Sequence, residues 1–209
     1  MPRAEQQTAA PLIPARPTLT TLRKASSGCT ACELYKRGTQ TVFGAGLVRS
    51  RLMFIGEQPG NDEDLAGLPF VGPAGRLLDR SLEEAGIDRK EVYVTNVVKH
   101  FKWEPRGKRR IHKKPNAVEI NACFPWLEAE IAVIHPELLV CLGATAAQAI
   151  LGRKFRVTVE RGLILDSELG VRALATVHPS SILRAPDDET RRAERRLFVE
   201  DLRVAAGVL

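Results

Sequence analysis

Several features that would place the chain in a special class of protein are absent from its sequence. No apolar run approaches the ~18 residues of a membrane-spanning helix, and no internal repeat is present. The N-terminal residues are rich in Pro, Ala and Gln and have no apolar stretch of the signal-peptide type. We therefore expect a cytoplasmic protein that uses no membrane.

Hydrophobic residues, in contrast, are plentiful. They make up 44% of the 209 residues, which excludes global disorder. A chain of this length suits one domain. We expect residues 1–17 to form a disordered N-terminal tail, residues 18–209 to form the domain, and the protein to be a monomer.

Acidic residues are nearly missing from one segment. From Lys99 to Lys114 there are eight basic residues and one acid, Glu104, so sixteen residues carry a net charge of +7. Of the 31 basic and 25 acidic residues in the chain, this leaves 23 and 24 elsewhere, a net charge of −1. Concentrated Lys and Arg contact phosphates, so nucleic acid is the favoured partner and an acidic protein the alternative. A solvated surface loop is the simplest interpretation of such a run.

Cysteine is also scarce, and the four residues do not suggest a disulfide scaffold. Cys29 and Cys32 form a Cys-x-x-Cys motif that can hold a metal ion or one edge of an iron–sulfur cluster. Cys123 falls on the apolar face of an expected helix and is the third candidate ligand. The fourth stays open between Cys141, which lies in an apolar strand, and His100, which follows a strand.

Strand and helix patterns alternate along the chain. Hydrophobic runs predict strands at 51–56, 91–98, 137–142, 162–165 and 171–177, and helical spacing predicts helices at 73–85, 116–134, 144–151 and 187–206. Asn116 and Glu119 have the spacing of a capping box. We expect an α/β fold in one domain, with a central, mainly parallel four-stranded sheet flanked by helices and a basic insertion loop at about 101–115.

Polar clusters follow three of the expected strands. They are residues 57–60 after the first strand, Asn96 near the end of the second, and residues 178–181 after the last. Because ligands of parallel sheets bind outside the carboxyl ends of the strands, these clusters predict a site at that edge. His178 is a candidate residue of this site, whereas His135 is expected to be a surface residue in a turn.

His112 lies inside the basic segment and has two interpretations. It is either one more polar residue of a solvated loop or a functional group held against a phosphate backbone. In the second case nearby cations would lower the pKa of its imidazole and leave it neutral and nucleophilic.

Taken together, the motifs resemble those of the iron–sulfur uracil-DNA glycosylases of family four, from about Cys29 to the C-terminus. The matching segments are Gly-Glu-Gln-Pro-Gly at 56–60, Glu-Asp at 63–64, Leu-Pro-Phe-Val-Gly-Pro-Ala-Gly at 68–75, Val-Thr-Asn-Val-Val-Lys at 94–99, Leu-Gly-Ala-Thr-Ala at 142–146 and His-Pro-Ser-Ser at 178–181.

Three departures from that family are similar to the X-type uracil-DNA glycosylases, which become covalently joined to the DNA they act on. Gln58 stands where family four has alanine, and His100 stands where it has cysteine. The chain between His100 and Cys123 is longer and contains Lys-Arg-Arg-Ile-His. The resemblance implies a [4Fe–4S] cluster held by Cys29, Cys32, His100 and Cys123, with Cys141 as a core thiol.

The resemblance also implies how a flipped uracil is bound and cleaved. Phe70 stacks on the base, Asn96 reads its Watson–Crick edge, and Gly56 and Asp64 complete the uracil-binding group. His178 stabilises negative charge at uracil O2.

A covalent link to C1′ of the abasic site is implied at His112. Glu57 would orient and polarise this imidazole, and Gln58 would help to hold the loop closed. The resemblance implies that residues 181–184 form a wedge. The residues expected to contact DNA are Lys99, Lys108, Arg109, Arg110, Lys113, Ser180, Leu183 and Arg184.

Other functions remain open at this stage. The expected partner is uracil-containing DNA, single-stranded and double-stranded. The first alternative to covalent capture is an ordinary multiple-turnover uracil-DNA glycosylase. A second is a non-catalytic nucleic-acid-binding protein in which Cys29, Cys32 and Cys123 hold zinc, and a third is a redox-sensing cluster protein.

Overall fold

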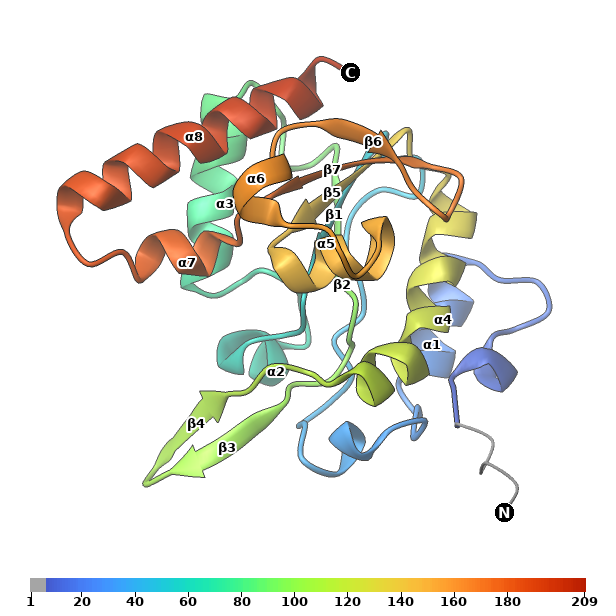
Figure 1. Cartoon of the computed structure of the whole chain (residues 1–209). Coiled ribbons are helices and arrows are strands. Elements are labelled where there is room, and N and C mark those ends of the chain that lie inside the picture. The colour runs from blue at the N-terminus through green and yellow to red at the C-terminus, as the bar shows by residue number, and fades with distance from the viewer. Residues whose placement is uncertain (1–6) are drawn as a thin grey trace.

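The computed structural model describes residues 7–209 and contains a five-stranded sheet in the order β2-β1-β5-β7-β6 (Figure 1). Four strands are parallel, namely β1 (Leu52–Gly56), β2 (Tyr93–Asn96), β5 (Leu138–Leu142) and β7 (Arg172–Thr176). The fifth, β6 (Ile164–Asp166), pairs antiparallel with β7. The mainly parallel α/β fold is confirmed, but the count of four strands is wrong, because β6 adds an antiparallel edge.

Helices cover both faces of this sheet (Figure 1). On one face α3 (Pro73–Glu84), α7 (Pro179–Leu183) and α8 (Asp188–Ala206) pack on a core that includes Phe54 and Val140. On the other, α1 (Leu19–Ser26), α4 (Ala117–Ile134) and α5 (Ala144–Leu151) pack on a core that includes Met53 and Cys141. Neighbouring residues of a strand thus point to opposite cores, as the two-residue period of strands requires.

The main helices begin and end near the residues that the sequence predicts. The capping box of α4 is formed, because Glu119 N–H donates to Asn116 Oδ1 (2.9 Å) and Asn116 N–H donates to Glu119 Oε2 (2.7 Å). Pro73 occupies the first turn of α3, where no backbone N–H is needed. Pro125 lies inside α4, which continues through it. The short helix α6 (Val157–Glu160) follows α5.

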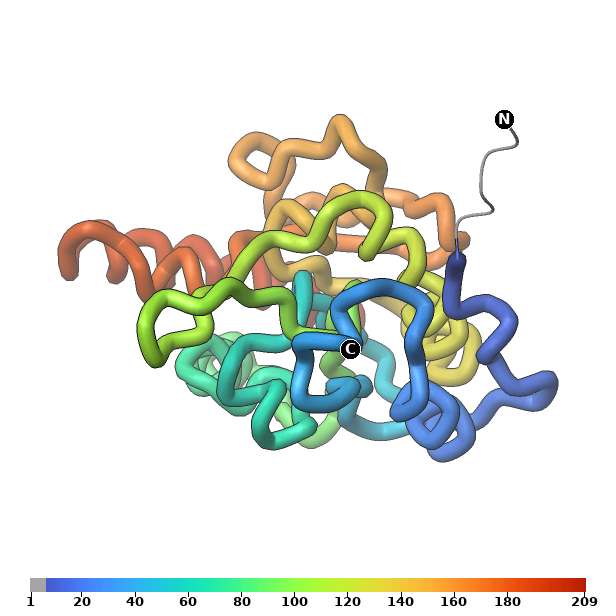
Figure 2. Tube along the Cα trace, turned by 90° about the horizontal axis from the view of Figure 1, so that it is seen from below, coloured from blue at the N-terminus to red at the C-terminus, as the bar shows by residue number. Residues whose placement is uncertain are grey.

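The expected insertion loop at about 101–115 is a β-hairpin. Strands β3 (Trp103–Arg106) and β4 (Arg109–His112) pair antiparallel, and Gly107 adopts φ +59° at the turn. The hairpin projects from the body of the domain (Figures 1 and 2). Its strands are mostly exposed, so the hydrophobic patterns that identify the central strands are missing here.

Several short elements lie outside the sequence predictions. They are α1, α2 (Asn61–Ala66), α6, α7, and the 3₁₀ helices η1 (Ala10–Leu12) and η2 (Glu33–Lys36). Residues 1–6 of the expected tail lie outside the described residues. Residues 7–17 include η1, and Ala9 is buried with its N–H donating to the carbonyl oxygen of Ala122 (2.8 Å). None of the described helices has the length and apolar character needed to cross a membrane.

Candidate active site

A cavity of about 910 Å³ opens at the carboxyl ends of the parallel strands. Glu57 and Gln58 follow β1, Asn96 ends β2, and His178 follows β7, and all four side chains line it. The register places Gly56 beside Asn96 and Leu142 beside Thr176, so these strands end at the same level. The prediction that the three polar clusters meet at one edge is confirmed.

An aromatic ring and an amide share one wall of this cavity. Phe70 adopts φ +57°, a strained conformation for a bulky residue, and its ring lies 6.2 Å from that of His178 at an interplanar angle of 28°. A Cβ atom on Gly56 would lie 2.4 Å from Asn96 Oδ1 and 2.8 Å from Phe70 Cζ. Gly56 therefore allows Phe70 and Asn96 to approach each other.

Glu57 connects His112 to the body of the domain. Its Oε1 lies 3.5 Å from His112 Nε2, and its Oε2 accepts a short hydrogen bond from the Thr145 hydroxyl at the start of α5. The His112 side chain is about half exposed (49%), and the pKa of its imidazole is lowered mainly by partial desolvation and further by Arg184, while Glu57 opposes the shift. The expected neutral imidazole is thus supported, but the cause is partial desolvation and Arg184 rather than the lysines and arginines of its own segment. Thr145 lies in the Leu-Gly-Ala-Thr-Ala motif, yet nothing in the sequence marks its hydroxyl as a partner of Glu57.

Gln58 anchors the base of the hairpin through the residues directly before β3 and after β4. Its Oε1 accepts from the Lys102 N–H (3.0 Å), and its Nε2 donates to the carbonyl oxygens of Lys102 (3.2 Å) and Lys113 (3.0 Å). An alanine at this position could make none of these bonds. Gln58 therefore holds the segment that carries His112 against the cavity.

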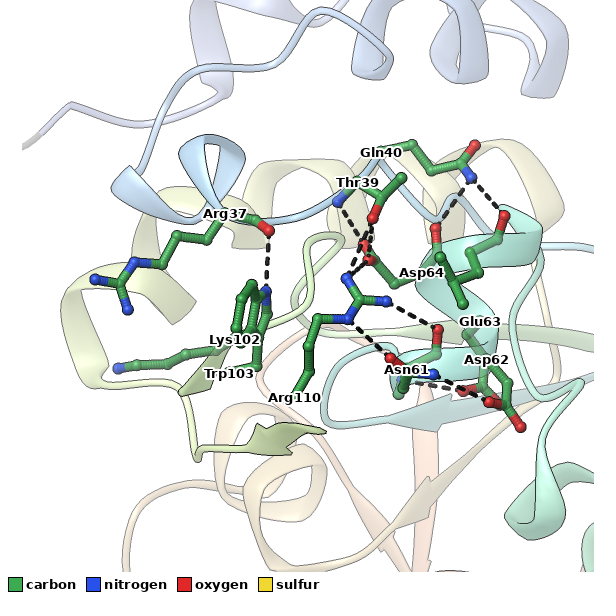
Figure 3. Close-up of polar contacts among 12 residues, drawn as sticks. Arg37, Thr39, Gln40, Asn61, Asp62, Glu63, Asp64, Lys102, Trp103 and Arg110 are labelled. Carbon is green, nitrogen blue, oxygen red and sulfur yellow. Dashed lines mark hydrogen bonds and ion pairs between the residues drawn. The ribbon is translucent and has the colours of Figure 1, made fainter. Parts of the chain in front are cut away.

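Arg110 fastens the hairpin to α2 (Figure 3). Its guanidinium donates to Asp64 Oδ2 (2.6 Å) and Asn61 Oδ1 (2.8 Å), and Thr39 N–H donates to Asp64 Oδ1 (2.9 Å). Trp103 Nε1 donates to the carbonyl oxygen of Arg37 (2.9 Å) from the partner strand.

Two residues with predicted roles in binding are paired within the protein. Asp64 is fully buried and lies outside the cavity lining, and its carboxylate accepts from Arg110 and Thr39, so the predicted contact with uracil finds no support in this geometry. Arg110 was expected to contact DNA, but its donors are directed at Asp64, Asn61 and Thr39 within the protein. Both residues position the hairpin instead.

Lys99 is likewise paired within the protein. Only 1% of its surface is exposed, and its ammonium is paired with Glu130 of α4, so the predicted contact with DNA finds no support in this geometry. Lys99 is part of the basic segment in the sequence, but in the fold it lies before the hairpin begins, in the interior of the domain. Glu130 is a predicted helix residue that carries no sequence signal of this pairing.

His178 is held in one tautomer by its neighbours. Its Nδ1 accepts from the Ser180 N–H (3.1 Å), so a neutral ring carries its proton on Nε2. The pKa of His178 is lowered to about 4, mainly by burial and further by Arg184 and His112. At neutral pH the ring is therefore a neutral hydrogen-bond donor.

The other predicted DNA-contacting residues lie around the mouth of the cavity or on the hairpin. Ser180, Leu183 and Arg184 line the cavity. Lys108 and Arg109 are exposed near the hairpin turn. Lys113 forms an ion pair with Glu104 across the hairpin (2.8 Å), and Lys114, which was not singled out for DNA, also lines the cavity.

The expected cluster ligands occupy one lobe beside α4. Cys29 and Cys123 are buried, and their sulfur atoms accept from Trp126 Nε1–H (3.3 Å) and from the Lys99 N–H (3.2 Å). Burial raises the pKa of Cys123 to about 12, with smaller contributions in the same direction from Cys32 and Cys29. The three thiols are thus electrostatic neighbours.

His100 lies in the same lobe and is buried. Its Nε2 is 3.0 Å from Thr41 Oγ1, and its pKa is lowered mainly by burial, with Asp64 opposing. Within residues 7–209 no three His, Cys, Asp or Glu side chains are grouped closely enough for a single metal ion. Cys141 is fully buried in β5, and burial raises its pKa to about 12, as expected of a core thiol.

The fold and the cavity define an α/β protein whose site, at the carboxyl edge of the sheet, combines an aromatic ring, an amide and two neutral imidazoles. Residues 43–203 match the uracil DNA glycosylase superfamily, and the chain belongs to that family. It is 41% identical over 182 residues to the type-4 uracil-DNA glycosylase of Thermotoga maritima, covering 87% of this chain and 89% of the relative.

Two further relatives extend the likeness. The type-4 uracil-DNA glycosylase of Archaeoglobus fulgidus is 36% identical over 165 residues, covering 76% of this chain and 79% of the relative. The type-5 uracil-DNA glycosylase of Thermus thermophilus is 30% identical over 181 residues, covering 77% of each. These matches establish the superfamily, but they do not establish the X-type assignment expected from the sequence.

Proposed function

We propose that the chain excises uracil from DNA by breaking the N-glycosidic bond. The single observation that carries this proposal is the convergence of Phe70, Asn96 and His178 on one cavity in a member of this superfamily. Type-4 and type-5 uracil-DNA glycosylases are among its relatives.

A uracil turned out of the DNA stack would enter this cavity. The Phe70 ring offers a stacking surface, and the Asn96 amide has one acceptor and one donor for the N3–H and O4 of uracil. As the bond to N1 breaks, its electron pair leaves with the base, and negative charge develops on O2. The Nε2–H of His178 is suited to stabilise that charge without a change of protonation.

Base specificity tests this proposal. Three oligonucleotides of one sequence, with uracil, thymine or cytosine at a single position, are incubated with the protein, and the free bases are measured by chromatography. Uracil alone should be released. Release of thymine or cytosine at a comparable rate would contradict the base-reading role of Asn96.

We further propose that Cys29, Cys32, His100 and Cys123 hold a [4Fe–4S] cluster. Thiolates and an imidazole are suitable ligands, and the N–H groups of Trp126 and Lys99 already point at two of the sulfur atoms. When bound, the cluster would supply structural cross-linking of the lobe.

The cluster proposal has a spectroscopic test. The purified protein should be brown, absorb near 400 nm and contain about four iron and four sulfide per chain. A colourless protein that contains zinc would support the metal-binding alternative.

Two fates of the sugar are possible after the base leaves. The relatives support an ordinary enzyme, in which water attacks C1′ and the enzyme turns over. One observation favours covalent capture: His112 lines the cavity and contacts Glu57. In that case a ring nitrogen would donate its lone pair to C1′, the other nitrogen would lose its proton to Glu57, and uracil would leave as the anion and take up a proton from solvent.

A denaturing gel separates the two fates. With uracil-containing DNA in excess, the ordinary enzyme releases many uracil molecules per chain and no protein–DNA band survives denaturation. Covalent capture would instead give one uracil per chain and a slow band that His112→Ala abolishes while uracil release continues.

A further inference from the structure

A buried polar network lies behind the wall that carries Asn96. Glu130 of α4 is fully buried, and its carboxylate accepts from the Tyr93 hydroxyl (2.8 Å), the Thr95 hydroxyl (3.0 Å) and the Gly44 N–H (3.1 Å). The ammonium of Lys99 completes it with a short ion pair to Glu130. None of these groups lines the cavity, and the proposed excision does not use them.

The Lys99 ammonium donates hydrogen bonds to three different acceptors. Besides Glu130, its Nζ donates to the Thr95 hydroxyl (2.7 Å) and to the carbonyl oxygen of Asn96 (2.7 Å). Its backbone N–H donates to Cys123 Sγ (3.2 Å). One residue thus joins the end of β2, helix α4 and the cysteine lobe.

Stability alone does not account for such a pair. Removing two charges from water is costly, and a buried ion pair can often be replaced by apolar residues without loss of stability. The pair instead fixes a position, because the hydrogen bond from Lys99 Nζ to the carbonyl oxygen of Asn96 holds the main chain of Asn96 in place. The side chain of Asn96 has little space to compensate for a shift, since its Oδ1 already lies against Gly56.

We propose that Lys99 and Glu130 are positioning residues that hold Asn96 in register for base reading. The inference rests on the proposed function, because that function makes uracil the partner of Asn96. Displacement of a binding group by about 1 Å can lower a rate on the order of 100-fold. Loss of the pair should therefore impair uracil handling more than it impairs folding.

The test compares the double variant Lys99→Met/Glu130→Gln with Ile131→Ala. The double variant leaves no unpaired buried charge, and a glutamine can still accept from Tyr93 and Thr95. Ile131 is buried on the same helix and contributes only to the apolar core, so Ile131→Ala controls for lost stability. Thermal unfolding and absorbance near 400 nm are recorded for both.

Single-turnover uracil release and inhibition by free uracil measure the effect, and both readings hold whether or not the enzyme turns over. The double variant should release uracil at least tenfold more slowly than Ile131→Ala and be inhibited less by free uracil. Equal rates and equal inhibition in the two variants would overturn the proposal.

The side-chain amide resonance of Asn96, assigned by its absence in Asn96→Asp, reports position without catalysis. It should move in the double variant and stay in place in Ile131→Ala, and an unmoved resonance in the double variant would also overturn the proposal. If the wild type releases no uracil but the resonance moves, the proposed function fails while the positioning role stands.

Discussion

At the residue scale, the site depends on a glycine that has no side chain to contribute to it. Gly56→Ala would place a methyl group 2.4 Å from Asn96 Oδ1 and 2.8 Å from the Phe70 ring. We expect uracil release under single-turnover conditions to fall on the order of 100-fold, because both base-binding groups must move.

Gly207→Ala is the matched control for this substitution. The nearest atom to its Cβ would be the Val204 carbonyl oxygen at 3.4 Å, an ordinary contact at the end of α8. Activity in Gly56→Ala equal to that of Gly207→Ala would show that the wall is not as tight as the structure describes.

His178 gives a residue-scale prediction about pH. Its pKa is about 4 in the folded protein against an ordinary 6.5, so the unfolded chain takes up a proton first as the pH falls. The stabilisation is complete above pH 6.5 and is lost between 6.5 and about 4, on the order of 3 kcal/mol.

Urea unfolding between pH 7.5 and 4.5 measures this dependence. His178→Asn should flatten it, whereas His135→Asn, at an exposed position, should leave it unchanged. An identical pH dependence of wild type and His178→Asn would refute the assigned cause.

At the element scale, the β3–β4 hairpin is held by specific polar contacts rather than by a core. Arg110 supplies bonds to Asp64 and Asn61, and Gln58 supplies the contacts at the base. Arg110→Met should therefore speed hydrogen exchange of the amides in 103–112. Lys108→Met, at the exposed turn, is the control and should change little, so equal exchange in the two variants would argue against the fastening role of Arg110.

The sequence predicts those elements whose own residues carry a hydrophobic pattern or a helix cap. The central strands and α3, α4, α5 and α8 carry hydrophobic periodicity and caps, and these were found. The hairpin is exposed on both faces, so its pairing depends on the turn at Gly107 and on contacts with distant residues such as Asp64. The positive charge of the segment led to the prediction that Lys99 and Arg110 contact DNA. A sequence does not reveal which basic side chain pairs with a buried carboxylate.

At the scale of the whole molecule, the uneven charge should govern the approach to DNA. Each phosphate contact to a single strand contributes about −0.7 to the slope of log K against log salt concentration. Lys108→Ser and Arg109→Ser should each make the slope shallower by about that amount, as measured by fluorescence anisotropy with a uracil-containing single strand.

Arg172→Ser serves as the control for the salt dependence. Arg172 is exposed at the start of β7, at the sheet edge opposite the cavity. A slope that changes as much in Arg172→Ser as in Lys108→Ser would mean that the hairpin has no special place in the encounter with DNA.

The central claim is that this cavity excises uracil with Asn96 as the reader of the base. Chromatographic measurement of free uracil, released from an oligonucleotide with one uracil by the wild type and by Asn96→Ala, tests it most directly. The account predicts rapid release by the wild type and a loss on the order of 100-fold or more in Asn96→Ala, since the base is then no longer held in place. Absence of release by the wild type, or equal release by the two proteins, would contradict it.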